Sequence, residues 1–292
     1  ARIAQAMQIY KDVLGRQPGR DAVRRSLAEL QVEILGDRGA DPQQVSAARA
    51  NLLSLQKKAP DDGDLAYLLG RCYQADGEDR EALEAYTAAV ARRSKDRFDA
   101  RQRMATLYRG ERLNSPADAD RVIDEMVKEE PDDYRTHLAR GRYRLQLLKP
   151  GEDPSAAEAD FQDAIRLAPT EAQPYLELSQ AKRRRTPPDL AGAEAALAKG
   201  LEAAPKSGPL HLAMAVMKLT TEDLDGGLKA LRRGLEALPD DAALRVTLAD
   251  ALASRGATAE LREQARELYR IGLKAYGDYY SAFSLVNARE WN

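Results

Sequence analysis

The 292-residue chain carries 45 basic and 47 acidic side chains, a formal net charge of −2 at pH 7, and only 5% of its residues are aromatic. This balance argues against binding to nucleic acid or to an acidic membrane through bulk charge. The one cysteine, Cys72, excludes an internal disulfide. No apolar run approaches the roughly 20 residues that a membrane-spanning helix needs.

One apolar pattern recurs from end to end of the chain. A small residue is followed by a large apolar residue four positions on, a small or apolar residue three further on, and a proline five beyond that. Steps of four and three place these residues on one helix face, and a proline just past the end stops the helix. In chain order the stripes begin at Ala6, Ala48, Ala82, Ala119, Ala157, Ala193, Gly227 and Ala265, and Ser94 and Gly277 take the proline position in two of them.

A second stripe precedes most of these helices and predicts a partner helix for each. It combines large apolar residues with a small residue, which lets two helix backbones approach closely. The clearest copies are Leu69, Gly70 and Tyr73; Met104, Ala105 and Tyr108; Tyr175, Leu178 and Ser179; His211, Met214 and Ala215; and Leu248, Ala249 and Leu252.

Together the two stripes resemble the tetratricopeptide repeat (TPR), a helix–turn–helix unit of about 34 residues. The resemblance implies an all-α, right-handed superhelical solenoid of antiparallel helix pairs that covers nearly the whole chain. Neither end resembles a polar cap, so we expect a fragment of a longer protein. We predict a half repeat at 1–18, repeats at 19–60, 61–94, 95–131, 132–169, 170–205, 206–239 and 240–277, and a partial helix at 278–292.

The segments between the stripes predict turns and helix caps. Extra residues rich in Pro and Gly fall mostly between the two helices of a repeat, near Gly36–Gln44, Arg109–Pro116, Leu148–Pro154, Arg184–Leu190 and Arg255–Glu260. Pro-Asp-Asp at Pro60–Asp62, Pro131–Asp133 and Pro239–Asp241 immediately precedes a first helix. We interpret these carboxylates as N-caps rather than as a metal or acid–base site, and we expect Thr170 with Glu171 to do the same.

Other motifs that suggest chemistry have structural interpretations. His137 and His211, the only two histidines, occupy the same repeat position, usually filled by a bulky aromatic, which indicates packing; Cys72 is expected to be a buried thiol. The basic run 182–185 ends a first helix, where cations favour the dipole, and Gly226-Gly227 lacks the Lys that a phosphate loop needs. We therefore predict no enzyme activity, no cofactor and no metal.

In the TPR family the first helices line a concave groove that takes a peptide or a partner helix. An arginine stripe in the middle repeats favours an acidic or C-terminal peptide, while the C-terminal end of the groove is apolar. The Lys and Asn pair with which chaperone-binding members clamp a terminal carboxylate is missing. The predicted groove residues are Tyr67, Arg71, Gln74, Gln102, Thr106, Arg109, Leu138, Arg142, Leu176, Gln180, Arg183, Leu212 and Val216, and Leu219 and Val246 extend the apolar end.

The sequence thus predicts a non-enzymatic protein–protein interaction scaffold. Two alternatives stay open: an assembly scaffold of a bacterial envelope or polysaccharide-export apparatus, or a regulatory array fused to an enzyme outside this sequence. Expected partners are a protein or peptide, with nucleic acid disfavoured and no membrane insertion. The final partial helix, with Tyr279, Tyr280, Phe283 and Leu285, lacks a covering helix and suggests a homodimer through that end. The compartment is not predicted.

Overall fold

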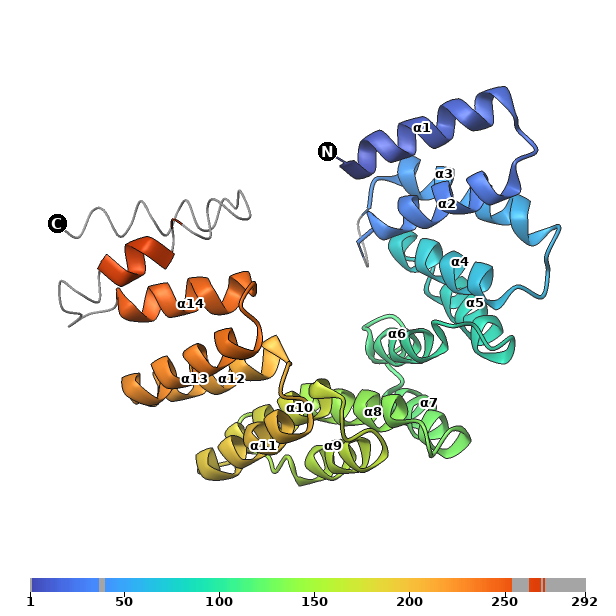
Figure 1. Cartoon of the computed structure of the whole chain (residues 1–292). Coiled ribbons are helices and arrows are strands. Elements are labelled where there is room, and N and C mark those ends of the chain that lie inside the picture. Colours follow the sequence, from blue (N-terminus) through green and yellow to red (C-terminus); the bar gives the residue numbers. More distant parts are fainter. Residues whose placement is uncertain (1, 37–39, 254–262, 269, 271–292) are drawn as a thin grey trace. The chain divides into compact units, whose positions relative to one another are not determined.

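The computed structural model describes residues 2–36, 40–253, 263–268 and 270, and this part of the chain is helical without strands (Figure 1). A short helical run at 263–268 follows the last labelled helix. The labelled helices are α1 (Arg2–Arg16), α2 (Asp21–Glu33), α3 (Pro42–Gln56), α4 (Gly63–Asp76), α5 (Asp79–Ala91), α6 (Arg97–Arg109), α7 (Pro116–Glu129), α8 (Tyr134–Leu147), α9 (Ser155–Leu167), α10 (Ala172–Arg183), α11 (Leu190–Ala203), α12 (Gly208–Thr220), α13 (Leu224–Ala237) and α14 (Ala242–Leu252).

The chain divides into two compact units, Ala1–Pro131 and Asp132–Asn292, which are described separately below as unit 1 and unit 2. Unit 1 contains α1 to α7, and unit 2 contains α8 to α14. The division falls at the boundary predicted between the repeats 95–131 and 132–169. The single continuous solenoid expected from the sequence stays a prediction.

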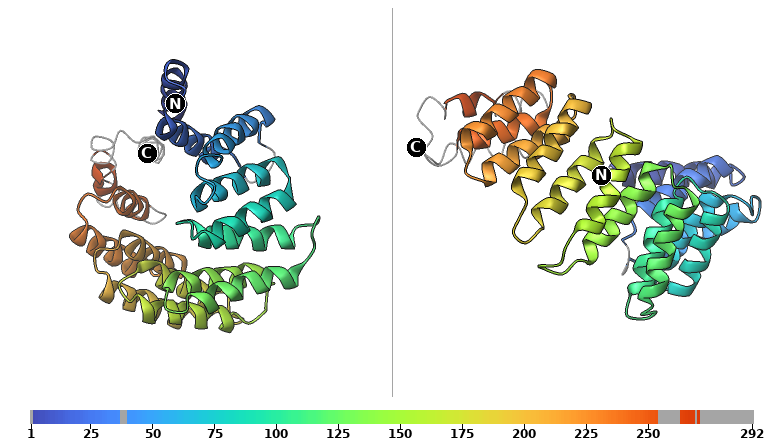
Figure 2. Two further views of the ribbon diagram at one scale, coloured as in Figure 1. Left: turned by 90° about the vertical axis from the view of Figure 1, so that its right-hand side faces the viewer. Right: turned by 90° about the horizontal axis from the view of Figure 1, so that it is seen from below.

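Within each unit, successive helices form the pairs that the stripes predict (Figure 2). In unit 1 the pairs are α2 with α3, α4 with α5, and α6 with α7; in unit 2 they are α8 with α9, α10 with α11, and α12 with α13. Consecutive helices that pack side by side across so few connecting residues run antiparallel. The predicted all-α architecture of stacked helix pairs is confirmed.

The even-numbered helices form the inner layer of each unit. In unit 1, α2 contacts α4 and α4 contacts α6; in unit 2, α8 contacts α10, α10 contacts α12 and α12 contacts α14. Among the described residues, odd-numbered helices of the same unit make no such contact with one another. Neighbouring helix pairs of a unit therefore approach each other more closely through their even-numbered helices than through their odd-numbered ones. The sequence predicts that these even-numbered helices line the groove.

Small residues on the stripes permit the close packing inside each pair. A methyl group added at Gly70 would lie 2.5 Å from the ring of Tyr86, and one added at Gly227 would lie 2.6 Å from Leu219. Gly227 is thus a packing residue, as the small-residue stripe predicts. Asp223, which the sequence interpretation did not single out, caps α13 by accepting a hydrogen bond from the Gly226 amide at 2.8 Å.

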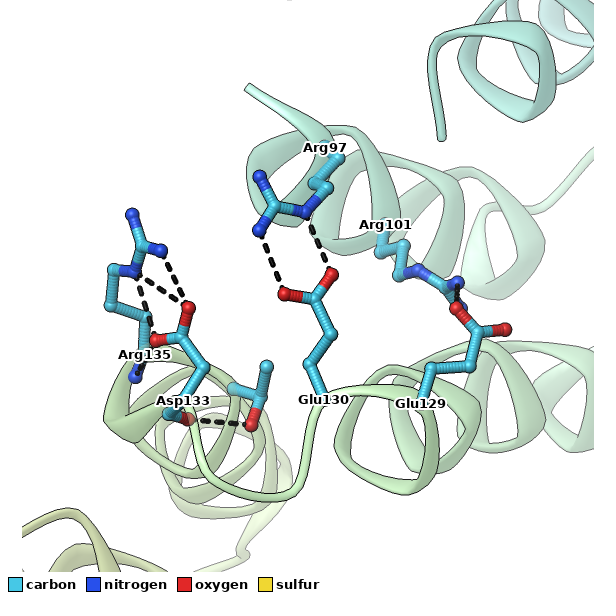
Figure 3. Close-up of polar contacts among 7 residues, drawn as sticks. Arg97, Arg101, Glu129, Glu130, Asp133 and Arg135 are labelled. Atoms are coloured by element: carbon cyan, nitrogen blue, oxygen red, sulfur yellow. Dashed lines mark hydrogen bonds and ion pairs between the residues drawn. The ribbon is translucent and has the colours of Figure 1, made fainter. Parts of the chain in front are cut away.

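The N-caps that the Pro-Asp-Asp segments predict are also confirmed. Asp62, Asp133 and Asp241 accept hydrogen bonds from backbone amides in the first turns of α4, α8 and α14. Figure 3 shows Asp133 with Arg135, whose guanidinium also pairs with the capping carboxylate. The prediction for Glu171 is wrong, because it precedes α10 without a side-chain cap bond. Its side chain is one methylene longer than that of aspartate, a preferred capping residue.

The longer connections lie inside the helix pairs, as predicted. The connection between α6 and α7 spans 110–115, that between α8 and α9 spans 148–154, and that between α10 and α11 spans 184–189. By contrast, α4 ends at Gly77, whose φ of +78° gives the left-handed backbone of a tight C-cap. The predicted turn near Arg255–Glu260 and the final partial helix at 278–292 lie outside the described residues.

Candidate functional site

All of the predicted groove residues lie on even-numbered helices. Those of unit 1 come from α4 and α6, and those of unit 2 come from α8, α10, α12 and, for the buried Val246, α14. Because each unit is described by itself, the two sets are two separate candidate surfaces here. Their individual contacts differ, and these contacts decide which side chains are available to a ligand.

In unit 1, two predicted groove residues belong to an internal hydrogen-bond network. The buried Tyr67 hydroxyl donates to Asp99 at 2.5 Å, and the buried Gln74 side chain accepts from the Tyr86 hydroxyl at 2.7 Å. Arg103 links the two pairs, since it bonds to Asp99 at 2.6 Å and to Gln74 at 3.3 Å. Burial, with the nearby Asp99 carboxylate, raises the pKa of Tyr67 to about 12. Tyr67 and Gln74 therefore join α4, α5 and α6 to one another.

The predicted arginines of unit 1 also have acceptors within the unit. The Arg71 guanidinium donates to the carbonyls of Val32 and Leu35 near the end of α2, at 3.4 and 3.3 Å. Arg109 pairs with Asp120 at 2.5 Å across the α6–α7 pair. Gln102 and Thr106 lie between these groups on α6, where Thr106 is exposed.

In unit 2, Arg142 is paired while Arg183 is free. Arg142 on α8 bonds to Glu177 on α10 at 2.7 Å, and Gln173 donates to the same carboxylate at 2.9 Å. Arg183 and Gln180 are exposed on α10, and Arg183 has no partner among the described residues. The helix position alone does not separate these two arginines, because the partner of Arg142, Glu177, lies 35 positions away in the next repeat.

The apolar part of the predicted groove lies on α10 and α12. Leu176 and Leu212 occupy equivalent repeat positions and are half-buried, and Val216, one turn beyond Leu212, is 39% exposed. Leu138, predicted for the same groove, is buried in the core of α8, α9 and α10. We call Leu176, Leu212 and Val216 the α12 face. Its side chains are available without breaking an ion pair.

One repeat position near the start of the even-numbered helices holds a buried polar side chain in α6, α8, α10, α12 and α14, and the apolar Ala66 in α4. Tyr175, His211 and Arg245 each bond to the carbonyl of the proline six residues earlier, which ties the helix to the turn before it. His137, at the same position, is also buried, so the expectation of a packing role for both histidines is confirmed. The sequence interpretation missed Arg245, although its spacing from His211 matches one repeat.

Arg101, at this position in unit 1, has no proline behind it and pairs with Glu129 of α7 instead (Figure 3). Arg97, one turn earlier, forms a bidentate pair with Glu130 at 2.8 and 2.7 Å. The two pairs fasten α6 to the C-terminal end of α7.

Most side chains of the basic run 182–185 form ion pairs or hydrogen bonds within unit 2. Arg185 forms a bidentate bond with the buried Glu158 at 2.6 and 2.9 Å, and Lys182 lies 3.4 Å from the same carboxylate. Arg184 donates to carbonyls at the end of α8, those of Leu145 and Leu148. The run therefore links α10 to α9 and α8 rather than only complementing its own helix end. Because three of its four side chains already have partners, most of the run is not available to bind nucleic acid.

The described residues contain no cluster of three or more potential metal ligands. Cys72 is fully buried, as predicted, and burial raises the pKa of its thiol to about 12, which keeps it protonated at neutral pH. In the part of the chain that the structure describes, no helix is long and apolar enough to span a membrane.

Comparison with known proteins identifies the fold. No protein-family model and no curated protein sequence matches the chain. Among solved structures, yeast Tom70 superposes with a TM-score of 0.62 at 18% identity, over 94% of this chain and 57% of Tom70. A tetratricopeptide repeat protein from Parabacteroides merdae has a TM-score of 0.47 at 17% identity, over 91% of this chain and 98% of that one. The C-terminal part of a TPR protein from Cytophaga hutchinsonii has 0.48 at 14%, over 83% and 93%.

The chain is an all-helical repeat protein with the TPR fold, as its stripes predict. It spans just over half the length of the Tom70 chain. At this level of identity the likeness establishes the fold, and any activity or partner of the chain has to be argued from its own residues.

Proposed function

We propose that this chain is a non-enzymatic scaffold that binds an extended segment or helix of a partner protein on its even-helix side. The observation that carries the proposal is the α12 face, where the exposed Val216 continues the half-buried Leu176 and Leu212. Apolar side chains at the centre of a contact supply most of the affinity of such interfaces, and polar groups at the margin orient the ligand. Gln180 and Arg183 form that margin on α10.

The arginine contribution is secondary in this proposal. An acidic peptide that binds Arg142 has to displace Glu177, and one that binds Arg109 has to displace Asp120. Exchanging one carboxylate for another gains little free energy, because the ion pairs lost and formed are similar. Among the arginines named for the groove, Arg183 is the one that offers an unpaired guanidinium in the described structure.

The test is a selection of peptides from a phage-displayed random library against the full chain, followed by affinity measurements on variants. Val216→Glu places a charge in the apolar face and should weaken the selected peptides by about tenfold or more. Leu190→Glu is the matched control, because Leu190 is an apolar residue of the same unit, 44% exposed, but on the odd-numbered α11. Peptides that bind both variants as they bind the wild type would contradict the proposal.

A further inference from the structure

Unit 2 has a second hollow, on its odd-helix side. A furrow of about 560 Å³ runs between α11 and α13 with α12 beneath it, and we call it the α11–α13 furrow. Its volume lies within the range of pockets that hold ligands. The α12 face consists of Leu212 and Val216 of α12 with Leu176 of α10, and none of these residues lines the furrow. The two surfaces are therefore distinct.

The floor of the furrow is apolar and partly exposed. Ala198 and Leu201 contribute from α11, Met214 from α12, and Ala230 from α13, and each of them is half-buried. The alanines leave room above the backbone, and the flexible methionine side chain adapts to the shape of whatever enters. A bulky apolar side chain of a partner fits these surroundings.

The α13 rim of the furrow carries unpaired positive charge. Lys229 and Arg233 stand one helical turn apart, are exposed, and have no partner among the described residues. Lys218, deeper in the furrow, is neutralised by Glu194 at 2.6 Å and by Asp223 at 3.6 Å. The exposed Glu202 on the α11 side repels an anion. A carboxylate in this furrow is therefore directed toward α13.

A hollow of similar size in unit 1 has two of its three arginines neutralised. It measures about 570 Å³ and lies against α5, α6 and α7. Its half-buried and buried arginines, Arg97 and Arg101, are held by Glu130 and Glu129 (Figure 3). Arg93, which also lines this hollow, is exposed and has no partner among the described residues. The α11–α13 furrow differs in carrying two such cations one helical turn apart on α13.

We propose that the α11–α13 furrow is a second protein-docking surface, which takes a segment that combines one bulky apolar residue with neighbouring carboxylates. The apolar side chain occupies the floor around Met214, and the carboxylates bind Lys229 and Arg233. Guanidinium and ammonium groups at a rim bind carboxylates and direct the ligand, while the apolar anchor supplies the affinity. This surface would let one unit hold two partner segments, one on each side.

The probe is a set of short fluorescein-labelled peptides, each with one Leu, Phe or Trp flanked by Glu residues, and the same peptides with Gln in place of Glu. Binding to the full chain is measured by fluorescence anisotropy. The best Glu peptide should bind about tenfold more tightly than its Gln counterpart, because its carboxylates meet two free cations. Raising the salt concentration should reduce this difference, because the rim is exposed to solvent.

Adjacent arginines provide a matched pair of variants. Arg233→Glu and Arg232→Glu make the same charge change at consecutive exposed positions of α13, but Arg232 does not line the furrow. Arg233→Glu should weaken the Glu peptide by about fivefold or more, and Arg232→Glu by less than about twofold. Ala198→Phe fills the floor and should abolish binding, with circular dichroism confirming that the helices are retained.

Three results would overturn the proposal. They are equal weakening by the two arginine variants, binding that persists in the folded Ala198→Phe variant, and failure of every Glu peptide to bind at millimolar concentration. Val216→Glu separates this surface from the α12 face, since it should leave the Glu peptide unaffected. If Val216→Glu loses binding and Ala198→Phe does not, the peptide binds on the even-helix side. That result would reject the furrow proposal and leave the proposed function of the α12 face standing.

Discussion

Gly141 provides a quantitative test of the close packing inside a helix pair. It lies in the middle of α8, where its backbone passes over the ring of Phe161 from α9. A methyl group at this position would lie 2.5 Å from Cε1 and 2.8 Å from Cδ1 of that ring. Because Phe161 is fully buried, the ring cannot turn into solvent, and Gly141→Ala forces the two helices apart.

Two opposing contributions set the size of the effect. Alanine is more favourable than glycine inside a helix by about 1 kcal/mol. Inserting a methyl group into a filled core costs about 1–3 kcal/mol. Since the contact at 2.5 Å is shorter than any normal carbon–carbon contact, the cost should lie in the upper part of this range. Gly141→Ala should therefore destabilise the α8–α9 pair by about 1–2 kcal/mol.

Gly15 in α1 is the control, because a methyl group added there meets nothing within 4 Å. Gly15→Ala should stabilise its helix, by at most about 1 kcal/mol. The two substitutions are chemically identical, so opposite signs isolate the packing contribution from the intrinsic helix preference.

Amide hydrogen exchange is the appropriate assay, because the repeats of a solenoid open locally and a single unfolding free energy is poorly defined. Opening free energies should fall for amides of α8 and α9 and stay unchanged in unit 1. Phe161→Leu, combined with Gly141→Ala, should relieve the clash and give a coupling energy of about 1 kcal/mol. Stabilisation by Gly141→Ala, or coupling near zero, would refute the reasoning.

Three further predictions follow from the buried polar groups. Asp160, whose side chain is 2% exposed, holds two arginines of α8, and Asp160→Ala should lower the free energy of unfolding by about 2–3 kcal/mol. Glu125→Ala removes an exposed carboxylate that pairs with the exposed Arg121, and it should cost less than about 0.5 kcal/mol. Equal costs in urea denaturation would contradict this prediction. Cys72, whose pKa is raised to about 12, should react with iodoacetamide only as fast as the fold opens, so immediate labelling in native buffer would count against its burial. Burial raises the pKa of Tyr67 to about 12, above its unfolded value of about 10. The unfolded state therefore loses the proton first, and the stability of the fold falls as pH rises between these values. The Tyr67→Phe variant should lose less stability in that window, and identical pH profiles for the variant and the wild type would be evidence against the prediction.

The architecture could be predicted because it depends on local sequence. Stripes with steps of four and three define helices, and Pro-Asp-Asp segments define where α4, α8 and α14 begin. Even the failed cap at Glu171 changes no helix boundary, because the following apolar stripe still determines α10. These features require only a few consecutive residues to agree, and the sequence displays them directly.

The availability of the groove residues could not be predicted in this way. Tyr67 was assigned to the groove because of its helix position, but its hydroxyl bonds to Asp99, 32 positions away. Arg142 was assigned as a free cation, but it pairs with Glu177, 35 positions away. A repeat position fixes which face of a helix a side chain occupies. It does not fix whether the neighbouring repeat supplies a partner.

The separations of these pairs nevertheless follow a rule. Arg25 with Asp62, Arg97 with Glu130, and Arg142 with Glu177 are 37, 33 and 35 positions apart, close to one repeat length. In a stack where each repeat contacts its neighbours, the next repeat is one source of partners for a charge. The other source is the second helix of the same pair, which supplies Asp120 to Arg109 and Asp160 to Arg140. Comparing each charge with the residues one repeat away would have marked Arg142 as paired before the structure was known.

The same rule predicts that recognition concentrates at particular repeats rather than along the whole array. Charges that link neighbouring repeats are already neutralised, so they hold the stack together and contribute little to a ligand. Under the two proposals above, affinity for a partner depends on side chains that the next repeat leaves unmatched: Val216 on the even-helix side of unit 2, and Lys229 with Arg233 on its odd-helix side. If this reasoning is correct, giving Arg233 an acidic partner on α13, by Lys229→Glu, should remove acidic-peptide binding while leaving the stability of the helix pair unchanged to within about 0.5 kcal/mol.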